Sequence, residues 1–388
     1  AEAKRCTGCT CEFCHRACDL LAIYKLQPKR FKDQIDGTVY PKNVDGQGHT
    51  VNRLIYSCNH CGHCREACPE SIDFDEFILQ SKRIMQKKGS LPWAFSAYWL
   101  RDFAQATGET ASLSKMPPNS QKPELVYFPG CQLGASEPRY VKASYEYLLT
   151  ENQATALMLN CCGAPLYWAG KEDEHQKFIA RLRTEWTSLG KPKMIFACPT
   201  CRKMFAEFLP EIPGEFIYES PGLKKLVAGS AAAATVSIFD PCVSRYFPPV
   251  QAAVRALLIA AGYKLQPLAE EKDKAKCCSW GGHVAIANPD YADKVTKRRL
   301  ALSDKPFVAY CSNCRDIFAK AGKPVRHIFD ILFDLNDDNR KPPLVTARQV
   351  TGKICKKIYC ILFGKQKKPN RFRTGPSIWK SLTGCGKN

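Results

Sequence analysis

Short apolar runs alternate with amphipathic stretches through the middle of the chain. The apolar runs predict buried strands: LVYF (125–128), ALML (156–159), MIFA (194–197), VSIF (236–239), a weaker run near 263–268, and FVAY (307–310). The stretches between them have apolar residues at helical spacing: 171–189, 249–261 and 289–302. Strands separated by helices predict parallel sheets built from right-handed crossovers.

Less regular stretches precede this alternating region. Residues 75–88 have the spacing of a helix that ends at Gly89, and residues 93–103 are expected to form a second packing helix. The Ser-, Pro- and Lys-rich segment 107–124 is interpreted as a linker. A domain boundary is therefore predicted within that linker.

The cysteines of the alternating region occur twice in one pattern. The first copy comprises Cys131, Cys161, Cys162, Cys198 and Cys201, and the second comprises Cys242, Cys277, Cys278, Cys311 and Cys314. Corresponding cysteines lie 111, 116 and 113 residues apart, which indicates a duplicated unit. Each cysteine element follows an apolar run or lies near one, and ligands of parallel sheets collect beyond the carboxyl ends of the strands. The cysteines are therefore expected at those ends.

A ferredoxin-like cysteine motif precedes the duplication. Its C-x2-C-x2-C-x3-C-P spacing is formed by Cys58, Cys61, Cys64 and Cys68. In this arrangement three cysteines hold one cubane cluster and the fourth joins another. One [4Fe–4S] cluster is therefore predicted on Cys18, Cys58, Cys61 and Cys64. Cys68 is predicted to join an earlier cysteine group in holding a second cluster.

That earlier group departs from the strict spacing. It comprises Cys6, Cys9, Cys11, Cys14 and Cys18. Either Cys9 is a ligand and Cys11 a bystander, or Cys11 is the ligand and Cys9 is spare. The intact C-x2-C step from Cys6 to Cys9 favours the first alternative. Asp19 also stands where this pattern usually has proline.

Between the two groups, a segment with several Gly and Pro residues is predicted to be an irregular insertion. His60 and His63 lie inside the second binding loop. Four cysteines are already available there, so these histidines are interpreted as hydrogen-bonding neighbours of a cluster or as exposed side chains.

Length and composition indicate a globular protein of two or three domains, since 388 residues with 45% hydrophobic content can bury more than one core. The sequence contains no run of about 18 apolar residues, so it predicts no membrane span. The first residues lack the apolar core of a signal peptide. We therefore expect a cytoplasmic protein. In that compartment, 22 cysteines clustered as CxxC, CC and CxxxC favour metal ligation over disulfides.

The net charge of +20 is concentrated at the C-terminal end. From Arg340 onwards there are 13 Lys or Arg residues and no Asp or Glu. The tail is either a solubilising, partly ordered extension or a contact for an acidic partner or an anionic membrane surface. Nucleic-acid binding is a weaker alternative, because no nucleic-acid fold signature accompanies the charge. Cys355, Cys360 and Cys385 lack a fourth ligand and are interpreted as non-ligands.

Five cysteines per copy exceed what common sites need. A cubane cluster or a zinc site uses four thiolates and leaves one cysteine per copy unexplained. A disulfide between adjacent cysteines is strained. A CC pair can instead bind two iron atoms of one enlarged cluster, so the pattern favours such a cluster.

These motifs resemble a known family. The sequence C131-x29-CC-x35-CxxC, followed by C242-x34-CC-x32-CxxC, resembles the cysteine-rich (CCG) domain of heterodisulfide reductases and related iron–sulfur oxidase subunits. Together with the N-terminal motifs, the chain looks most like the D-type heterodisulfide reductase subunit over residues 5–335. The resemblance implies a two-cluster ferredoxin-like α+β domain followed by a duplicated Rossmann-like α/β domain. It also implies two cubane clusters and one or two noncubane [4Fe–4S] clusters, each noncubane cluster held by one five-cysteine copy.

The resemblance has two departures, both in the second copy. There CCSWGG replaces CCG, and Asp-Pro-Cys-Val stands where relatives often have Asp-Pro-Cys-His. Trp280, between the cysteine pair and two glycines, is interpreted as lining the cluster pocket, with a core aromatic as the alternative. His327 resembles a histidine near the end of this domain and is assigned a packed structural role.

Two functions fit these features. The first is the reduction of a disulfide, with Cys242, Cys277, Cys278, Cys311, Cys314 and Trp280 as the catalytic group, in a subunit of an anaerobic complex. The second is pure electron transfer between a dehydrogenase or cytochrome and the quinone pool. Both need partners, such as a membrane cytochrome or a flavoprotein, and imply a peripheral position at the inner face of the membrane. A zinc-bearing scaffold is a third, non-redox interpretation, which an iron count would test.

The expected domains follow from the motifs. They are a ferredoxin-like domain (1–90), a helical segment and linker (91–124), two CCG repeats (125–230 and 231–336) and a basic extension (337–388).

Overall fold

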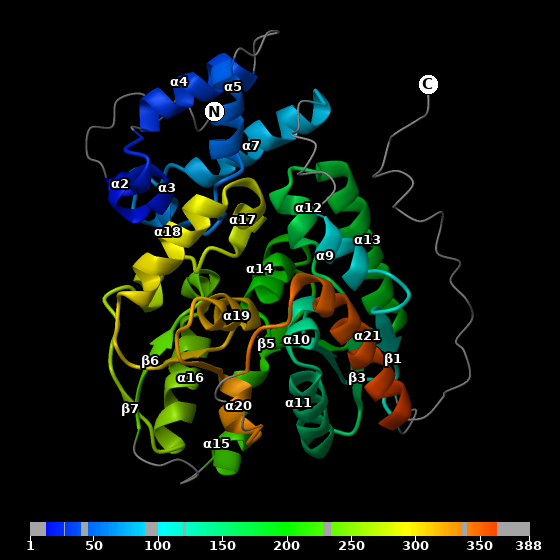
Figure 1. Ribbon diagram of the computed structural model, residues 1–388. Coiled ribbons are helices and arrows are strands. Elements are labelled where there is room, and N and C mark those ends of the chain that lie inside the picture. Colours follow the sequence, from blue (N-terminus) through cyan, green and yellow to red (C-terminus); the bar gives the residue numbers. More distant parts are fainter. Residues whose placement is uncertain are drawn as a thin grey trace. The chain divides into compact units, whose positions relative to one another are not determined.

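The computed structural model describes residues 13–26, 28–39, 46–89, 100–118, 122–227, 234–335 and 340–362. The chain divides into two compact units. Unit 1 consists of residues 1–91, 164–177 and 216–342, and unit 2 of residues 92–163, 178–215 and 343–388. Unit 1 therefore joins the N-terminal cysteine motifs with the second copy of the duplication. Figure 1 shows the fold and labels many of its helices and strands.

The N-terminal part of unit 1 is helical. Its helices are α2 (Phe13–Ala17), α3 (Asp19–Ile23), α4 (Pro28–Val39), α5 (Gly46–Ile55), α6 (His63–Glu66) and α7 (Phe74–Lys87). Helices α4, α5 and α6 each contact α7. Asp73 caps α7 by accepting a hydrogen bond from the Glu76 backbone N–H at 2.9 Å, and Gly89 follows the helix with a φ of +64°. The predicted helix at 75–88 is thereby confirmed.

The prediction of an irregular insertion between the two cysteine groups is wrong, because α4 and α5 lie there. Phe31 and Ile35 are one helical turn apart in α4, and both are fully buried. In α5, Val51, Leu54 and Ile55 are buried as well. Burial of one apolar face stabilises these helices despite the glycines in and around them.

Unit 1 also contains a four-stranded parallel sheet of the second copy. Its order is β7 (Lys264–Leu265), β6 (Thr235–Phe239), β8 (Phe307–Ala309) and β9 (Val325–His327). The helices between and around these strands are η2 (Ile217–Glu219), α15 (Gly222–Val227), η3 (Cys242–Tyr246), α16 (Pro248–Ala260), η4 (Lys272–Lys274), η5 (Gly281–His283), α17 (Val284–Ala287), α18 (Pro289–Leu300), α19 (Ser312–Lys320) and α20 (Ile328–Leu332). From the first copy, α12 (Ala164–Trp168) and the first turns of α13 (Glu172–Ser188) belong to this unit.

Unit 2 is built on a five-stranded sheet. Its order is β1 (Leu113–Lys115), β3 (Thr155–Leu159), β2 (Leu125–Phe128), β4 (Lys193–Phe196) and β5 (Gly214–Phe216). Its helices include α9 (Arg101–Ala106), α10 (Cys131–Ser136), α11 (Pro138–Glu151), α14 (Pro199–Phe208) and α21 (Val345–Leu362). β2 pairs in parallel with β3 and β4, whereas β1 joins β3 antiparallel. Strand β1 lies inside the segment interpreted as a linker, so that segment is partly ordered.

The two sheets share one topology. In each copy the first strand, β2 or β6, is central and lies between the second and third strands. The mixed α/β architecture and the parallel sheets are confirmed. The predicted helices at 171–189, 249–261 and 289–302 correspond to α13, α16 and α18. Most of the helix expected at 93–103 lies outside the described residues.

The basic C-terminal region begins with a long helix. α21 packs against α10 and α11 of unit 2, and Cys355 on its inner side is buried. Val350 and Ile354 are exposed. None of the helices in the described part of the chain is both long and apolar enough to cross a membrane.

Candidate metal centres

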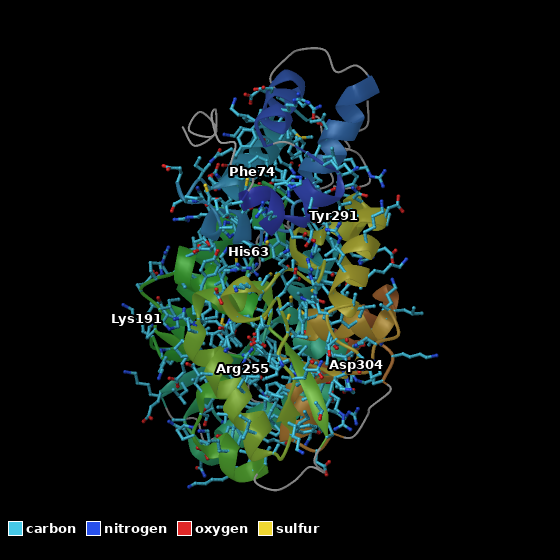
Figure 2. All side chains as sticks on the ribbon, turned by 90° about the vertical axis from the view of Figure 1, so that its left-hand side faces the viewer. His63, Phe74, Lys191, Arg255, Tyr291 and Asp304 are labelled. Atoms are coloured by element: carbon cyan, nitrogen blue, oxygen red, sulfur yellow. The ribbon has the colours of Figure 1, made fainter. Side chains whose placement is uncertain are left out.

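Five cysteines of unit 1 line one cavity. It encloses about 490 Å³ of space, its open mouth included, and its cysteine lining consists of Cys18, Cys58, Cys61, Cys64 and Cys277. Cys18 precedes α3, Cys58 and Cys61 come from the loop that leads into α6, and Cys64 lies within α6. Phe74 and Tyr291, both labelled in Figure 2, also line the cavity. The four cysteines predicted to hold one cubane cluster therefore lie together, and Cys277 of the second copy lies beside them.

These thiols favour the neutral form in the absence of a cation. Burial raises the pKa of Cys18 to about 12, and burial also raises the pKa of Cys58, Cys61 and Cys64 above the usual thiol value. A bound metal ion supplies the positive charge that converts such thiols to thiolates. An all-thiol donor set of this kind fits iron–sulfur clusters.

Hydrogen bonds join the ferredoxin loop to the second copy within unit 1. The side-chain amide of Asn59 donates to the carbonyl oxygen of Gly281 at 3.1 Å. The hydroxyl of Tyr291 donates to the other end of the same amide, Asn59 Oδ1, at 3.0 Å. Asn288 donates to Ser57 Oγ at 3.0 Å. The loop that carries Cys58 and Cys61 is thus held against the segment that follows Cys277 and Cys278.

This contact explains why CCSWGG departs from CCG. A side chain on Gly281 would begin 2.4 Å from the carbonyl oxygen of Asn59, and one on Gly282 would begin 2.1 Å from that of Cys58. Gly282 also has a φ of +66°, a conformation that favours glycine. The two extra glycines therefore allow the backbone of the ferredoxin loop to approach the second cysteine pair.

The second copy brings its five cysteines into one connected group in unit 1. Each of these thiols shifts the pKa of the next, in the order Cys242, Cys277, Cys278, Cys314 and Cys311. Cys311 is the N-cap of α19, two residues beyond the end of β8, and Cys242 begins η3 after β6. The hydrogen bonds from Cys242 and Cys278 lower the pKa of Cys277, while the hydrogen bond to Cys277 raises that of Cys242.

Trp280 packs beside this group. It lies against a buried apolar cluster that includes Cys278, Cys311 and Cys314. Its ring also meets that of His283 edge-on, with centroids 5.8 Å apart. Trp280 is thus part of the wall around the second cysteine group, and its contacts are those of a packed aromatic.

The first copy repeats the connected order in unit 2. Its thiols are joined in the order Cys131, Cys161, Cys162, Cys201 and Cys198. The Sγ atoms of Cys131 and Cys161 are 4.0 Å apart. Hydrogen bonding with Cys131 and Cys162, together with burial, raises the pKa of Cys161. Each position in this series corresponds to its counterpart in the second copy, so the duplication has preserved the arrangement of all five sulfurs.

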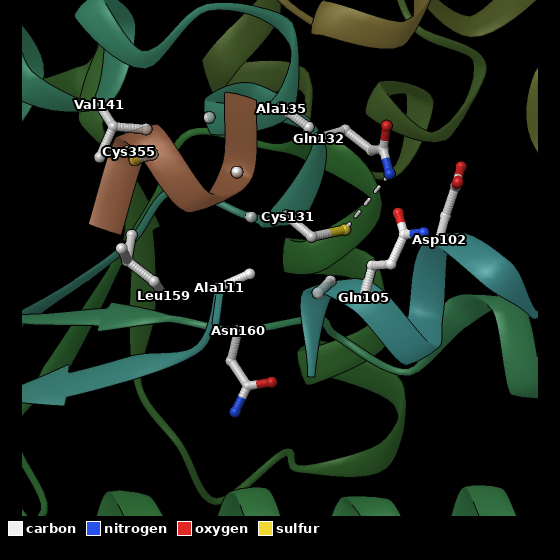
Figure 3. Close-up of a pocket in the computed structure, with 14 residues that line it drawn as sticks. Asp102, Gln105, Ala111, Cys131, Gln132, Ala135, Val141, Leu159, Asn160 and Cys355 are labelled. Atoms are coloured by element: carbon white, nitrogen blue, oxygen red, sulfur yellow. Dashed lines mark hydrogen bonds between the residues drawn. The ribbon is translucent and has the colours of Figure 1, made fainter. Parts of the chain in front are cut away.

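A cavity in unit 2 opens beside Cys131 (Figure 3). It encloses about 560 Å³ with its mouth and is lined by residues of α9, α10, β3 and α21. Gln132 donates to the Cys131 sulfur at 3.7 Å, and Asn160 Oδ1 accepts from the Cys161 backbone N–H at 2.8 Å. Cys355 forms part of the wall, and burial raises its pKa to about 12. Cys355 is therefore a packed thiol, as expected for a non-ligand.

In the ferredoxin loop, His60 is buried and His63 is half-buried. His60 hydrogen-bonds through Nδ1 to Asp75 and through Nε2 to the Lys82 ammonium, at 2.6 Å for the latter. Burial lowers the pKa of Lys82 to about 8. Burial, followed by the charge of Arg245, lowers the pKa of His63 to about 4. The interpretation of exposed side chains is wrong for His60, because this polar network holds it inside unit 1.

Asp19, the departure from proline in the first group, forms ion pairs with α18. It contacts Arg298 at 3.2 Å and also pairs with Arg299, which is 2% exposed. Arg299 pairs with Glu270 as well and donates to the Cys277 carbonyl oxygen at 3.2 Å. Asp19 thus links α3 to the second copy. The sequence had indicated no role for Arg298 or Arg299.

Several predicted residues cannot be placed at a site. Cys6, Cys9, Cys11 and Cys385 lie outside the described residues, so the alternatives for Cys9 and Cys11 stay open. Cys14 and Cys68 are half-buried. The cysteines that the structure describes form no disulfide. His327 is fully buried and caps α20, where Nδ1 accepts from the Phe329 backbone N–H at 3.2 Å.

Comparisons with known proteins identify the two cysteine-bearing regions. Residues 5–73 match the family model of the 4Fe-4S dicluster domain. Residues 125–206 and 236–318 each match the model of the cysteine-rich domain CCG. The chain belongs to the iron–sulfur proteins that combine a dicluster domain with a duplicated cysteine-rich domain.

Curated relatives include oxidoreductases. The D-type polypeptide of dihydromethanophenazine:CoB–CoM heterodisulfide reductase from Methanosarcina barkeri is 24% identical over 63% of this chain and 66% of that protein. An uncharacterized iron-sulfur protein of Methanocaldococcus jannaschii is 21% identical over 92% of this chain and 74% of that protein. The EtfAB:quinone oxidoreductase of Syntrophomonas wolfei is 23% identical over 60% of this chain and 37% of that protein.

The chain thus spans just under two thirds of the length of the heterodisulfide reductase subunits that it matches. These relatives and the two domain types show an iron–sulfur electron-transfer protein that carries [4Fe–4S] clusters and is related to oxidoreductases.

Proposed function

We propose that this chain passes electrons from the clusters of its dicluster domain to clusters on the two five-cysteine groups, and that a disulfide is reduced there. The observation that carries the proposal is the direct contact in unit 1 between the four-cysteine cavity and Cys277 of the second group. Such proximity suits electron transfer, and a protein that only stored clusters would not need it.

The proposed ligands of the cubane clusters follow the cysteine spacing, and those of the noncubane clusters follow the two five-cysteine groups. One cubane cluster is assigned to Cys18, Cys58, Cys61 and Cys64, and a second to Cys68, Cys14, Cys6 and Cys9. One noncubane cluster is assigned to Cys131, Cys161, Cys162, Cys198 and Cys201. The other is assigned to Cys242, Cys277, Cys278, Cys311 and Cys314. The matching order of the five thiols in both copies supports two clusters of one kind.

The reaction consumes two electrons and two protons, breaks one S–S bond and releases two thiols. Bound clusters deliver electrons singly and offer iron to a thiolate sulfur. The chain contributes the surroundings: Cys277 lines the cavity of the four ferredoxin cysteines, while Cys278 lies in a buried apolar cluster. Trp280 lines that cluster and is proposed to limit access to the second group. The second group and Trp280 are therefore the proposed catalytic site.

Partner subunits are proposed as electron donors. A membrane cytochrome or a flavoprotein would supply the dicluster domain. Lys353 and Lys357 on α21 are exposed, and no acidic residue follows Arg340, which supports contact of this region with an acidic partner or an anionic membrane surface.

The test is an anaerobic assay of purified protein with reduced viologen and a panel of disulfides, including the coenzyme M–coenzyme B heterodisulfide. Cys278→Ala and Cys162→Ala form a matched pair, because they occupy equivalent positions in the two copies. Each is expected to lose about four iron atoms, the content of one cluster of this type. Loss of turnover in Cys278→Ala alone supports the proposed site, whereas loss in Cys162→Ala alone would assign the reaction to the first group.

The second candidate function is electron transfer without substrate chemistry. This second function is supported by the similarity to EtfAB:quinone oxidoreductase, whose sequence identity to this chain is nearly the same as that of the heterodisulfide reductase relative. A protein with its full iron content but no turnover of any disulfide would refute the reductase proposal and support this alternative.

A further inference from the structure

Arg245 is a buried cation with an unusual set of partners. Its side chain donates to the carbonyl oxygens of Cys242 and Asp273, each at 2.9 Å, and to that of Ala275. The residue is 8% exposed. No carboxylate within the described ranges forms an ion pair with it. A buried charge held only by neutral carbonyls is costly unless another charge compensates it.

Other buried arginines of unit 1 have acidic partners. Arg299 pairs with Asp19 and Glu270, and Arg315 pairs with Asp316 at 3.1 Å. The half-buried Arg255 pairs with Asp240 at 2.7 Å. Arg245 therefore differs from its neighbours in the chemistry of its partners. Its hydrogen-bond partners are backbone carbonyl oxygens, one of them that of Cys242.

The position of Arg245 brings it between two cysteine groups. It lies in η3, three residues after Cys242, and the same short helix carries Tyr246. The hydroxyl of Tyr246 lies 2.1 Å from the point where a side chain on Gly62 would begin, so η3 contacts the loop immediately after Cys61. One end of η3 thus belongs to the second five-cysteine group, and the other meets the four-cysteine group.

The electrostatic influence of Arg245 agrees with this position. Burial raises the pKa of Cys61, and the charge of Arg245 opposes that rise. The hydrogen bond to Cys277 raises the pKa of Cys242, and Arg245 opposes this rise as well. A buried positive charge beside both cysteine groups favours the addition of an electron at either site, because that addition brings negative charge close to the guanidinium.

We propose that Arg245 is a positioning residue that supplies a buried positive charge to both cysteine groups and thereby raises the reduction potentials of the clusters that they hold. The proposal rests on the assigned cluster ligands but not on disulfide reduction. It predicts that the charge, more than the three carbonyl contacts, sets the potentials.

The experiment is an anaerobic redox titration of the full chain followed by electron paramagnetic resonance, with iron content measured on each preparation. Arg245→Gln removes the charge and retains a hydrogen-bond donor, while Arg245→Lys retains the charge with different geometry. Lys297→Gln removes an exposed charge from α18 and serves as the control, because solvent screens that charge.

We expect Arg245→Gln to lower the midpoint potentials of the two affected clusters by at least about 59 mV, a tenfold change in the equilibrium constant for one electron. Arg245→Lys should shift them by less than half as much, and Lys297→Gln should leave them unchanged. Unchanged potentials in an iron-replete Arg245→Gln protein would overturn the proposal, as would equal shifts in both Arg245 variants. If Arg245→Gln loses its iron, the outcome is judged on Arg245→Lys. An Arg245→Lys protein that keeps its iron and its midpoint potentials supports the proposed role of the charge, whereas one that loses its iron would assign Arg245 a purely structural role. None of these readouts depends on turnover of a disulfide.

Discussion

Gly282 is the position where one added carbon should disturb the contact between the ferredoxin loop and the second cysteine group. In Gly282→Ala the new Cβ would lie 2.1 Å from the carbonyl oxygen of Cys58. That oxygen belongs to the backbone, so the loop itself would have to move. Gly89→Ala is the matched control, because Gly89 has a φ of +64° against +66° for Gly282 and a Cβ added there would meet nothing within 4 Å.

The magnitude follows from two contributions. The left-handed backbone conformation costs an alanine about 1–2 kcal/mol, and both variants bear this cost. Forcing atoms into a packed site adds about 1–3 kcal/mol, and only Gly282→Ala bears this second cost. The difference of about 1–3 kcal/mol corresponds to a factor of about 5 to 150.

The assay measures release of iron to a chelator in urea under argon, since the clusters are lost when unit 1 opens. Gly282→Ala should release iron about 5 to 150 times faster than Gly89→Ala. This range assumes that the whole free-energy difference appears in the unfolding rate and none of it in the folding rate. Equal rates in the two variants would refute the reasoning, because they would mean that the ferredoxin loop does not pack on the second cysteine pair.

Three further predictions concern unit 1. Asp19→Ala removes a partner of the buried Arg299 and should lower the free energy of unfolding by about 3 kcal/mol. Chemical denaturation would measure this loss, and an unchanged free energy of unfolding would contradict a buried ion pair. Burial lowers the pKa of His327 well below its usual value, so the unfolded state binds the proton more readily and stability should decrease as pH falls below about 6.5, by at most about 1.4 kcal/mol per pH unit. His327→Asn should weaken that dependence, and identical pH profiles would contradict it. Cys64→Ala should remove about four iron atoms, and iron analysis that finds the wild-type content would exclude Cys64 as a ligand.

Local patterns in the sequence were sufficient for most elements of the duplicated region. The strand at 125–128 and the helix at 289–302 follow from apolar runs and helical spacing, because burial of an apolar face produces those periods directly. The repeated cysteine spacing similarly predicted that Cys131 and Cys242 are equivalent. The helices α4 and α5 were missed because their glycines and flanking Pro residues outweighed the weaker pattern of Phe31 and Ile35.

The sequence by itself therefore determined the candidate ligands, the parallel α/β architecture and the iron–sulfur chemistry. Only the tertiary structure decided that the ferredoxin loop meets the second copy, through Asn59 and Gly281, which are 222 residues apart. Spacing along the chain carries no signal for such a contact, because it depends on how folded surfaces fit. For the same reason the sequence did not indicate a role for Arg245, because the groups around its side chain come together only when the chain folds.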